Sequence, residues 1–200
     1  GEKREVKTVR KEVKSSIPIG DDTLSYVVSD KDLEHEMQMW RDGTFPMGLT
    51  WGIPELDRYH RLKRGQFNIM NGLDNVGKST LMWYLSVLSA MYHGWKWVIY
   101  SAENKPSTVK KKVIEFYWGQ EIRSLNDSQY DVADKFFKEH FRIIDNNQTY
   151  TYVDILNMVT NISTKWKADG LLIDPYNALI RENTGGQVNA HEYDYEAASI

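Results

Sequence analysis

The sequence predicts an α/β fold in which a mostly parallel central sheet is flanked by helices. From Gly48 onward, segments with the character of buried strands alternate with segments of helical periodicity. The strand candidates are continuous apolar runs rather than alternating ones, as expected for parallel strands that are covered on both faces. A glycine-rich loop also follows the first predicted strand and opens a helix, an order that is typical of nucleotide-binding α/β folds.

Apolar runs mark the predicted strands, and apolar residues three or four positions apart mark the helices between them. Strands are predicted at Phe67–Asn71, Trp97–Glu103, Phe141–Asp145 and Leu171–Pro175. Helices are predicted at residues 78–93, 106–118, 127–140 and 151–168. Gly94 and Gly119 are suited to end the first two helices, and Pro106 is suited to a first helical turn. Thr151 and Asp154 have the spacing of a capping pair at the start of the last one.

The N-terminal part of the chain, residues 1–46, is predicted to be a linker arm with one short helix, followed by an α/β core over residues 47–200. Residues 1–28 are rich in both charges and poor in apolar anchors, as in a solvated arm. Residues 29–41 have a helical pattern, with Ser29 and Asp32 as a capping pair. Leu33, Met37 and Trp40 form one apolar stripe. This stripe either packs on its own domain or reaches a neighbouring subunit.

Composition excludes several classes of protein. The 200 residues contain no cysteine, which excludes disulfides and thiolate metal sites and suits a reducing compartment. No apolar run approaches the length of about 18 residues that marks a membrane span. We therefore expect a soluble, internal protein with no membrane partner. A net charge of −3 does not indicate a protein that binds nucleic acid. It does not exclude a locally basic surface either.

The glycine-rich loop matches the phosphate-binding pattern G-x-x-x-x-G-K-[ST]. It comprises Gly72, Leu73, Asp74, Asn75, Val76, Gly77, Lys78, Ser79 and Thr80. The two glycines let successive backbone N–H groups turn toward phosphate oxygens. Lys78 supplies a cation for the outer phosphates, and the Ser79 hydroxyl can coordinate Mg²⁺. The pattern predicts that ATP and Mg²⁺ bind here. The alternative is a glycine turn beside a solvated lysine.

Two predicted strands end in a carboxylate, at the edge of the sheet where ligands of such folds bind. Asp174 follows three aliphatic residues, which is the Walker B pattern of a magnesium-binding aspartate. It could also simply cap the turn before Pro175. Glu103 ends the second strand and is a candidate general base that polarises the attacking water. A solvated loop glutamate is the alternative for this residue.

These motifs together resemble the RecA-fold helicase domain of the DnaB/Twinkle group of hexameric replicative DNA helicases, and the likeness points to a bacteriophage member. Residues 47–71 are similar to the lead-in of that group, T-G-x-x-x-L-D followed by G-L-x-x-G. Residues 101–106 resemble its S-L-E-M element, which implies that Glu103 is the catalytic base beside Lys78. Residues 173–177 resemble its Walker B strand, which implies that Asp174 holds Mg²⁺. The likeness covers roughly residues 30–200.

The resemblance also implies partners, missing parts and a location in the cytoplasm of a bacterial or phage-infected cell. It implies a hexameric ring on single-stranded DNA, an associated primase, and a helix at 29–41 that docks on the adjacent subunit. The loop Glu182–Gln187 corresponds to a DNA-facing loop, although such loops are often plain connections. The sensor strand and arginine finger of the group have no counterpart before Ile200, which falls in a further predicted helix (His191–Ile200). We therefore expect a fragment, truncated after the Walker B region and nearly inactive alone.

Three functions are compatible with these patterns. The first is an ATP-hydrolysing helicase motor that unwinds duplex DNA while it moves along a single strand. The second is a recombinase ATPase of the RecA/RadA type, which has the same phosphate loop and both carboxylates. The third is a nucleotide-gated assembly scaffold, which would bind ATP without needing a base at Glu103. A small-molecule kinase is disfavoured, because the lead-in at Gly48–Asp57 has no counterpart among nucleotide kinases.

Overall fold

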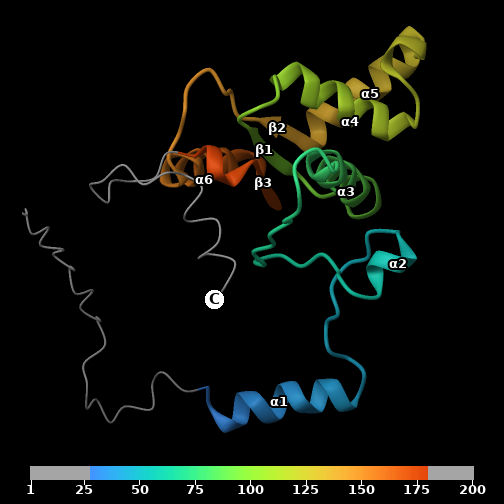
Figure 1. The fold of residues 1–200 in the computed structure, drawn as a ribbon. Helices are drawn as coiled ribbons and strands as arrows, with labels where there is room; N and C mark the ends of the chain where they lie inside the picture. The colour runs from blue at the N-terminus through green and yellow to red at the C-terminus, as the bar shows by residue number, and fades with distance from the viewer. Residues whose placement is uncertain (1–27, 180–200) are drawn as a thin grey trace, which may run out of the picture. The chain divides into compact units, whose positions relative to one another are not determined.

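The computed structural model describes residues 28–179, which divide into two compact units between Pro46 and Met47. The first unit contains the helix α1 (Asp30–Arg41). The second contains a three-stranded sheet and the helices around it (Figure 1). The predicted arm at residues 1–27, the loop Glu182–Gln187 and the predicted helix His191–Ile200 lie outside the described residues. None of the helices between residues 28 and 179 is long and apolar enough to cross a membrane.

Helix α1 confirms the helix predicted from the capping pair. Ser29 is the N-cap, and its hydroxyl accepts a hydrogen bond from the backbone N–H of Asp32. The helix contains no buried residue. Leu33, Met37 and Trp40 are 48%, 59% and 51% exposed, so the apolar stripe predicted from their spacing faces outward. The ring of Trp40 stacks on Phe45, which directly follows the turn at the end of the helix.

The sheet consists of β1 (Trp97–Ser101), β2 (Phe141–Ile143) and β3 (Gly170–Asp174). All pairs are parallel and the order is β2-β1-β3, so β1 is central and every one of its residues is buried. In the register with β3, Trp97 pairs with Gly170 and Ser101 pairs with Asp174. The carboxyl ends of β1 and β3 therefore meet at one edge of the sheet.

Helices cover both faces of this sheet, and Figure 1 shows α6 on one side with α3 and α4 on the other. The helices are α3 (Lys78–His93), α4 (Pro106–Trp118), α5 (Asp127–His140) and α6 (Tyr152–Trp166). Short helical turns are α2 (Pro54–Asp57), η2 (Ile122–Ser124) and η3 (Tyr176–Ala178). Trp97 and Ile99 of β1 face the cluster that includes α3 and α4, whereas Val98 and Tyr100 face the cluster that includes α6. The mixed α/β architecture with a parallel sheet is thus confirmed, and it is consistent with a RecA-like core.

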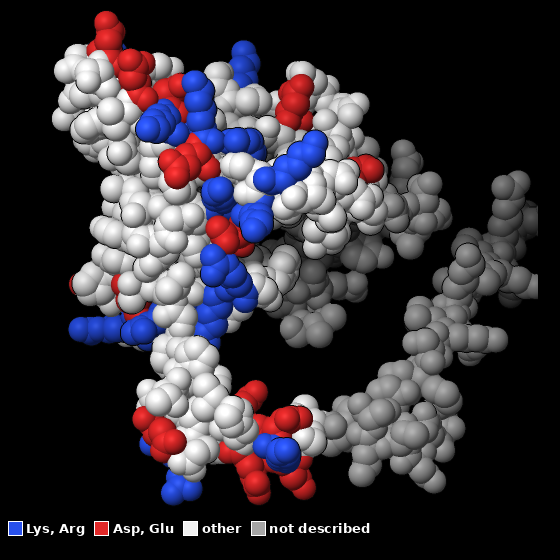
Figure 2. All heavy atoms as spheres, turned by 180° about the vertical axis from the view of Figure 1, so that it is seen from behind, with Lys and Arg blue, Asp and Glu red and all other residues white. Residues whose placement is uncertain are grey.

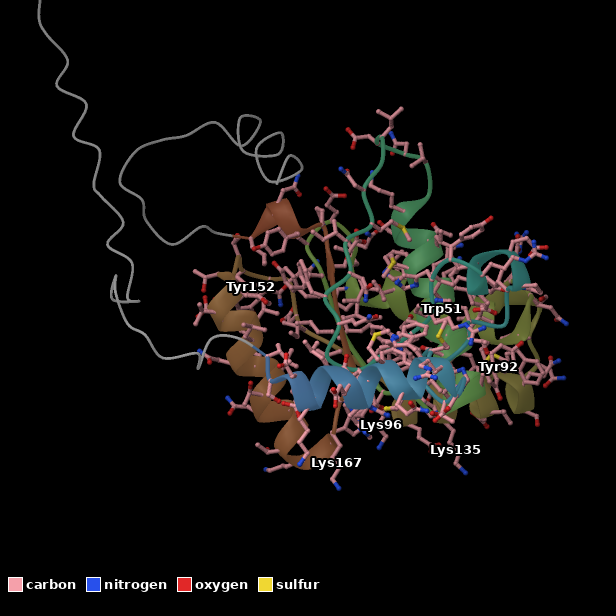
Figure 3. All side chains as sticks on the ribbon, turned by 90° about the horizontal axis from the view of Figure 1, so that it is seen from below. Trp51, Tyr92, Lys96, Lys135, Tyr152 and Lys167 are labelled. Atoms are coloured by element: carbon pink, nitrogen blue, oxygen red, sulfur yellow. The ribbon has the colours of Figure 1, made fainter. Side chains whose placement is uncertain are left out.

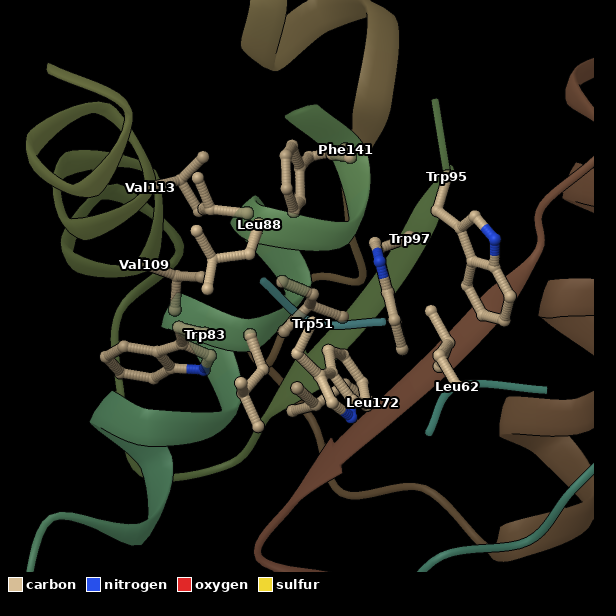
Figure 4. Packing of buried hydrophobic residues seen from close by; sticks show 14 residues of the cluster. Trp51, Leu62, Trp83, Leu88, Trp95, Trp97, Val109, Val113, Phe141 and Leu172 are labelled. Carbon is tan, nitrogen blue, oxygen red and sulfur yellow. The ribbon is translucent and has the colours of Figure 1, made fainter. Parts of the chain in front are cut away.

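The larger cluster is rich in tryptophan and joins α3, α4 and the sheet (Figure 4). Trp83 and Leu88 of α3 pack there with Val109 and Val113 of α4. Trp97 of β1 donates its indole N–H to the Ser89 hydroxyl of α3 at 2.8 Å. This bond satisfies two buried polar groups and ties the helix to the central strand.

Most predicted boundaries agree with the structure to within two residues. Helices α3, α4 and α5 have the predicted bounds, and α6 ends at Trp166 rather than residue 168 because Lys167 adopts a left-handed conformation (φ 52°). Strand β1 ends at Ser101 and β2 at Ile143, two residues earlier than predicted in each case. The next residue after each strand, Ala102 or Ile144, still donates its backbone N–H to the neighbouring strand, to the carbonyl of Asp174 or Ile99 respectively, and the regular pairing ends there.

The predicted strand at Phe67–Asn71 is wrong for the described structure. These residues form no regular strand, and Phe67 and Ile69 are 74% and 76% exposed. A strand needs the backbone groups of a neighbouring strand, and within residues 28–179 the strand β3 pairs with β1 alone. The apolar residues of this segment suit a strand, but a suitable composition does not supply the pairing partner.

The surroundings of Glu115 in α4 indicate that the stability of the folded protein depends on pH in the acid range. Burial raises the pKa of this carboxyl, but hydrogen bonds from Lys111, Lys112 and the backbone N–H of Ile122 outweigh it and lower the pKa to about 2. A pKa below the unfolded value means that the stabilisation is complete above pH about 4.5 and is lost as the pH falls toward 2.

We therefore expect Glu115→Gln to lower the melting temperature at pH 7, with a difference from the parent that disappears between pH about 4.5 and about 2. Thermal unfolding followed by circular dichroism across this range measures it. Glu121→Gln, at an exposed ion pair with Arg123, is the control and should change stability little. A Glu115→Gln deficit that stays constant down to pH 2 would contradict the prediction.

Candidate functional site

The glycine-rich loop leads directly into α3, so its residues surround the amino-terminal end of a helix. Gly77 is the N-cap residue and has a φ of 90°, a conformation that favours glycine. Asn75 is also left-handed, with a φ of 59°. Gly72 does not have a positive φ, and a Cβ added there would meet only ordinary contacts at 3.6 Å. The expected conformational need for glycine is thus seen at Gly77 and not at Gly72.

Lys78 closes this loop on itself. Its ammonium group donates hydrogen bonds to the carbonyl oxygens of Gly72 at 2.7 Å and of Leu73 at 2.6 Å. The loop is otherwise open to solvent, with Leu73 and Val76 strongly exposed. The ammonium group of Lys78 therefore lies within an exposed loop, where the two carbonyl oxygens are its hydrogen-bond partners. An anion that enters the loop can replace these carbonyls as the partner of Lys78.

Ser79 and Asp174, which the sequence predicted as metal ligands, are brought into direct contact. The Ser79 hydroxyl on α3 donates to the Asp174 carboxylate at the end of β3, with Oγ and Oδ1 2.9 Å apart across 95 residues of sequence. The second carboxylate oxygen, Oδ2, is buried and has no hydrogen-bond partner among the described residues. An unpaired buried carboxylate oxygen is costly, and a bound cation would satisfy it.

The first turn of α3 supports an anion at the same place. Its unpaired N–H groups and the helix dipole favour negative charge, and this turn carries no acidic side chain. No group of three acidic, histidine or cysteine side chains gathers anywhere between residues 28 and 179. A cation at Ser79 and Asp174 would therefore need further oxygen ligands, and the oxygens of a bound phosphate can supply them.

Glu103 lies at the same edge of the sheet, two residues beyond the end of β1. Ser101 pairs with Asp174, and the backbone N–H of Ala102 donates to the Asp174 carbonyl at 2.9 Å. The side chain of Glu103 is exposed and forms no hydrogen bond with the described residues. The segment that carries it is therefore attached to the strand that carries Asp174, while the carboxylate itself is open to solvent.

A network of polar side chains that holds the backbone on both sides of Glu103 was not predicted from the sequence. Asn146, three residues after β2, donates to the carbonyls of Ser101 and Asn104, and the Asn104 side chain donates to the Ser101 hydroxyl. The available signal was the polar run Asp145–Asn147 at the end of a predicted strand, because polar residues at that position of a parallel sheet face the site edge.

The opposite, amino-terminal end of the sheet is basic, and three of its cations have partners within the protein. The Arg142 guanidinium lies 4.4 Å from the centre of the Trp166 ring and the Lys96 ammonium lies 5.6 Å from it. Arg64 forms a salt bridge with Asp169 at 2.7 Å. Lys167 extends outward from the end of α6 (Figure 3). On the face that Figure 2 shows, lysines and arginines form a band in which acidic side chains are interspersed.

No family model matches the chain, whereas a comparison with curated proteins finds a distant relative. The chain is 26% identical over 174 residues to the Twinkle homolog protein, chloroplastic/mitochondrial, of Arabidopsis thaliana. The match covers 80% of this chain and 24% of the relative, so the chain spans about a quarter of that protein. This similarity supports, at the level of the superfamily, the resemblance to DnaB-like helicases that the sequence motifs indicated.

Proposed function

We propose that this chain is the ATP-hydrolysing motor domain of a hexameric replicative DNA helicase, which unwinds duplex DNA by moving along a single strand. The observation that carries the proposal is the contact between Ser79 and Asp174 at the amino end of α3. It joins the phosphate loop to the carboxyl edge of the sheet, where nucleotides bind in this class of fold. The similarity to a Twinkle homolog protein supports the same assignment.

Each part of the loop has a role in this proposal. The backbone N–H groups of residues 72–80 and the first turn of α3 bind the phosphates of ATP. Lys78 exchanges its carbonyl partners for phosphate oxygens. Ser79 and Asp174 hold the Mg²⁺ that accompanies the nucleotide, and this cation supplies electrostatic stabilisation of the transferred phosphoryl group. The unpaired Oδ2 of Asp174 fits this role.

Glu103 serves as the general base in the proposed reaction. Its exposed carboxylate, without a hydrogen-bond partner in the described chain, is available to orient a water molecule. The water donates a proton toward the carboxylate as its oxygen attacks the terminal phosphorus, and ADP leaves. In the proposed hexamer, a neighbouring subunit would supply an arginine to this site. Such a group contributes on the order of a thousandfold or more to turnover.

Helix α1 provides the contact between subunits in this proposal. Its stripe of Leu33, Met37 and Trp40 is exposed, and an isolated helix of 12 residues is too short to be stable in water alone. Docking on the adjacent subunit would bury the stripe and build the ring around single-stranded DNA. A primase is a further proposed partner of the complete protein.

Asp174→Asn tests the proposed metal site. The variant keeps the size of the side chain but removes the charge that holds Mg²⁺. We expect ATP affinity in the presence of Mg²⁺ to fall roughly 10- to 100-fold, as for changes around other metal sites. Affinity without Mg²⁺ should change little. Isothermal titration with a non-hydrolysable ATP analogue, with Mg²⁺ or with EDTA, measures both. Equal loss under the two conditions would contradict a role through the cation. Asp131→Asn, on the exposed face of α5, is the control.

Glu103→Gln tests the proposed base and separates the motor from a non-catalytic scaffold. Loss of a general base typically lowers turnover roughly 100- to 10,000-fold, while ATP affinity should stay close to the parent value. DNA-stimulated phosphate release by the complete protein is the measurement. Lys78→Ala is the companion variant, and it should lose ATP binding itself. Hydrolysis by Glu103→Gln at the parent rate would show that the base lies elsewhere.

Trp40→Ala tests the proposed subunit contact. Removing the largest side chain of the stripe should shift the complete protein from hexamers toward monomers, because the helix alone supplies little other apolar surface. Light scattering reports the oligomer, and thermal unfolding reports the α/β unit, which should be unaffected. His35→Ala, on the opposite side of the same helix, should leave the hexamer intact. A Trp40→Ala protein that stays hexameric, or whose α/β unit melts early, would favour packing of the stripe within one chain.

A further inference from the structure

The side-chain amide of Asn146 forms hydrogen bonds with the backbone on both sides of Glu103. The side-chain Nδ2 of Asn146 donates to the carbonyl oxygen of Ser101 at 2.9 Å and to that of Asn104 at 3.1 Å. A longer contact of 3.5 Å reaches the carbonyl of Ala102. The carbonyl groups before and after Glu103 thus converge on a residue that belongs to a different part of the chain.

This arrangement needs a donor, because carbonyl oxygens that point toward one another repel unless an N–H group lies between them. The Asn104 side chain reinforces the turn by donating to the hydroxyl of Ser101, which is buried. On the other side, the N–H of Ala102 is bound to the carbonyl of Asp174. The segment that carries Glu103 is therefore held by one side chain from the loop after β2 and by one backbone hydrogen bond to the end of β3.

We propose that Asn146 is a positioning residue, which fixes the backbone that carries Glu103 so that its carboxylate faces the phosphate loop. This inference rests on the proposed role of Glu103 as general base. Asn146 does not touch the reacting atoms; it acts through residues 101–104. Its loss would leave Glu103 present but poorly placed, and displacement of a catalytic group by about 1 Å can lower turnover roughly 100-fold.

A purely structural role for Asn146 has different consequences. The segment that these hydrogen bonds hold is followed closely by Pro106, the first residue of α4. Their loss could therefore loosen the packing of that helix instead. Such a change would lower the melting temperature and would act whether or not Glu103 carries a carboxylate. The two roles are therefore separated by making the same change with and without the base.

The experiment is a double-mutant cycle in the complete protein, with Asn146→Ala and Glu103→Gln singly and together. The measurements are kcat and KM for ATP at saturating Mg²⁺ and single-stranded DNA, at a temperature where circular dichroism shows every variant folded. We expect Asn146→Ala to lower kcat roughly 10- to 100-fold with KM changed less than about twofold. In the Glu103→Gln background it should cause no further loss.

Two more variants keep the test sharp if Asn146→Ala proves hard to fold. Asn146→Asp preserves size but places carboxylate oxygens against the carbonyls, and it should lower kcat at least as much. Asn146→Gln retains an amide donor and should recover part of the lost kcat. Asn147→Ala is the matched control, because the polar contacts of that neighbour are with Asp145, and it should keep the parent kcat.

The outcomes distinguish this inference from the proposed function. If Glu103→Gln abolishes turnover while Asn146→Ala and Asn146→Asp retain it, the positioning role is wrong and the base assignment stands. An Asn146→Ala loss of the same size in both backgrounds also overturns the positioning role, because it shows an effect independent of Glu103. If Glu103→Gln hydrolyses ATP at the parent rate, the base assignment fails and the inference built on it fails with it.

Discussion

The pairing of β1 with β3 is the constraint on which the candidate site depends. Gly170 begins β3 opposite Trp97, and a Cβ at that glycine would lie only 2.5 Å from the Trp97 ring, so the absence of a side chain permits this register. The same register sets Asp174 beside Ser101 at the other end of the two strands. Both proposed carboxylates of the site, Asp174 and Glu103, therefore take their places from one strand pairing.

Trp97 also connects that pairing to the helix of the phosphate loop. Its indole N–H is bound to Ser89 of α3, and its ring lies in the cluster with Trp83 and Leu88 of the same helix. Because α3 is fixed against β1 in this way, its first turn reaches the end of β3, and Ser79 contacts Asp174. The tryptophan-rich core is thus what places a loop and two strand ends, distant in sequence, at one edge.

Local patterns predicted the helices well, because their signals are carried by neighbouring residues: the capping pair Thr151 and Asp154, the terminal glycines and Pro106 all lie at the ends they mark. Ser79 and Asp174 were both predicted as Mg²⁺ ligands because a phosphate loop and a Walker B aspartate have related tasks, but the hydrogen bond between them was not predicted. The prediction of a strand at residues 67–71 was wrong because strand formation depends on a partner strand. Asn146 was missed because its hydrogen bonds join residues more than 40 positions away.

We propose that residues 72–80 and the ends of β1 and β3 form one Mg·ATP site. A crystal structure of this chain with Mg²⁺ and a non-hydrolysable ATP analogue tests it most directly. We expect the phosphates to lie within residues 72–80, Lys78 to have moved from its two carbonyls onto phosphate oxygens, and the cation to lie beside Ser79 and Asp174. Phosphates bound elsewhere, or a cation away from Asp174, would contradict the account.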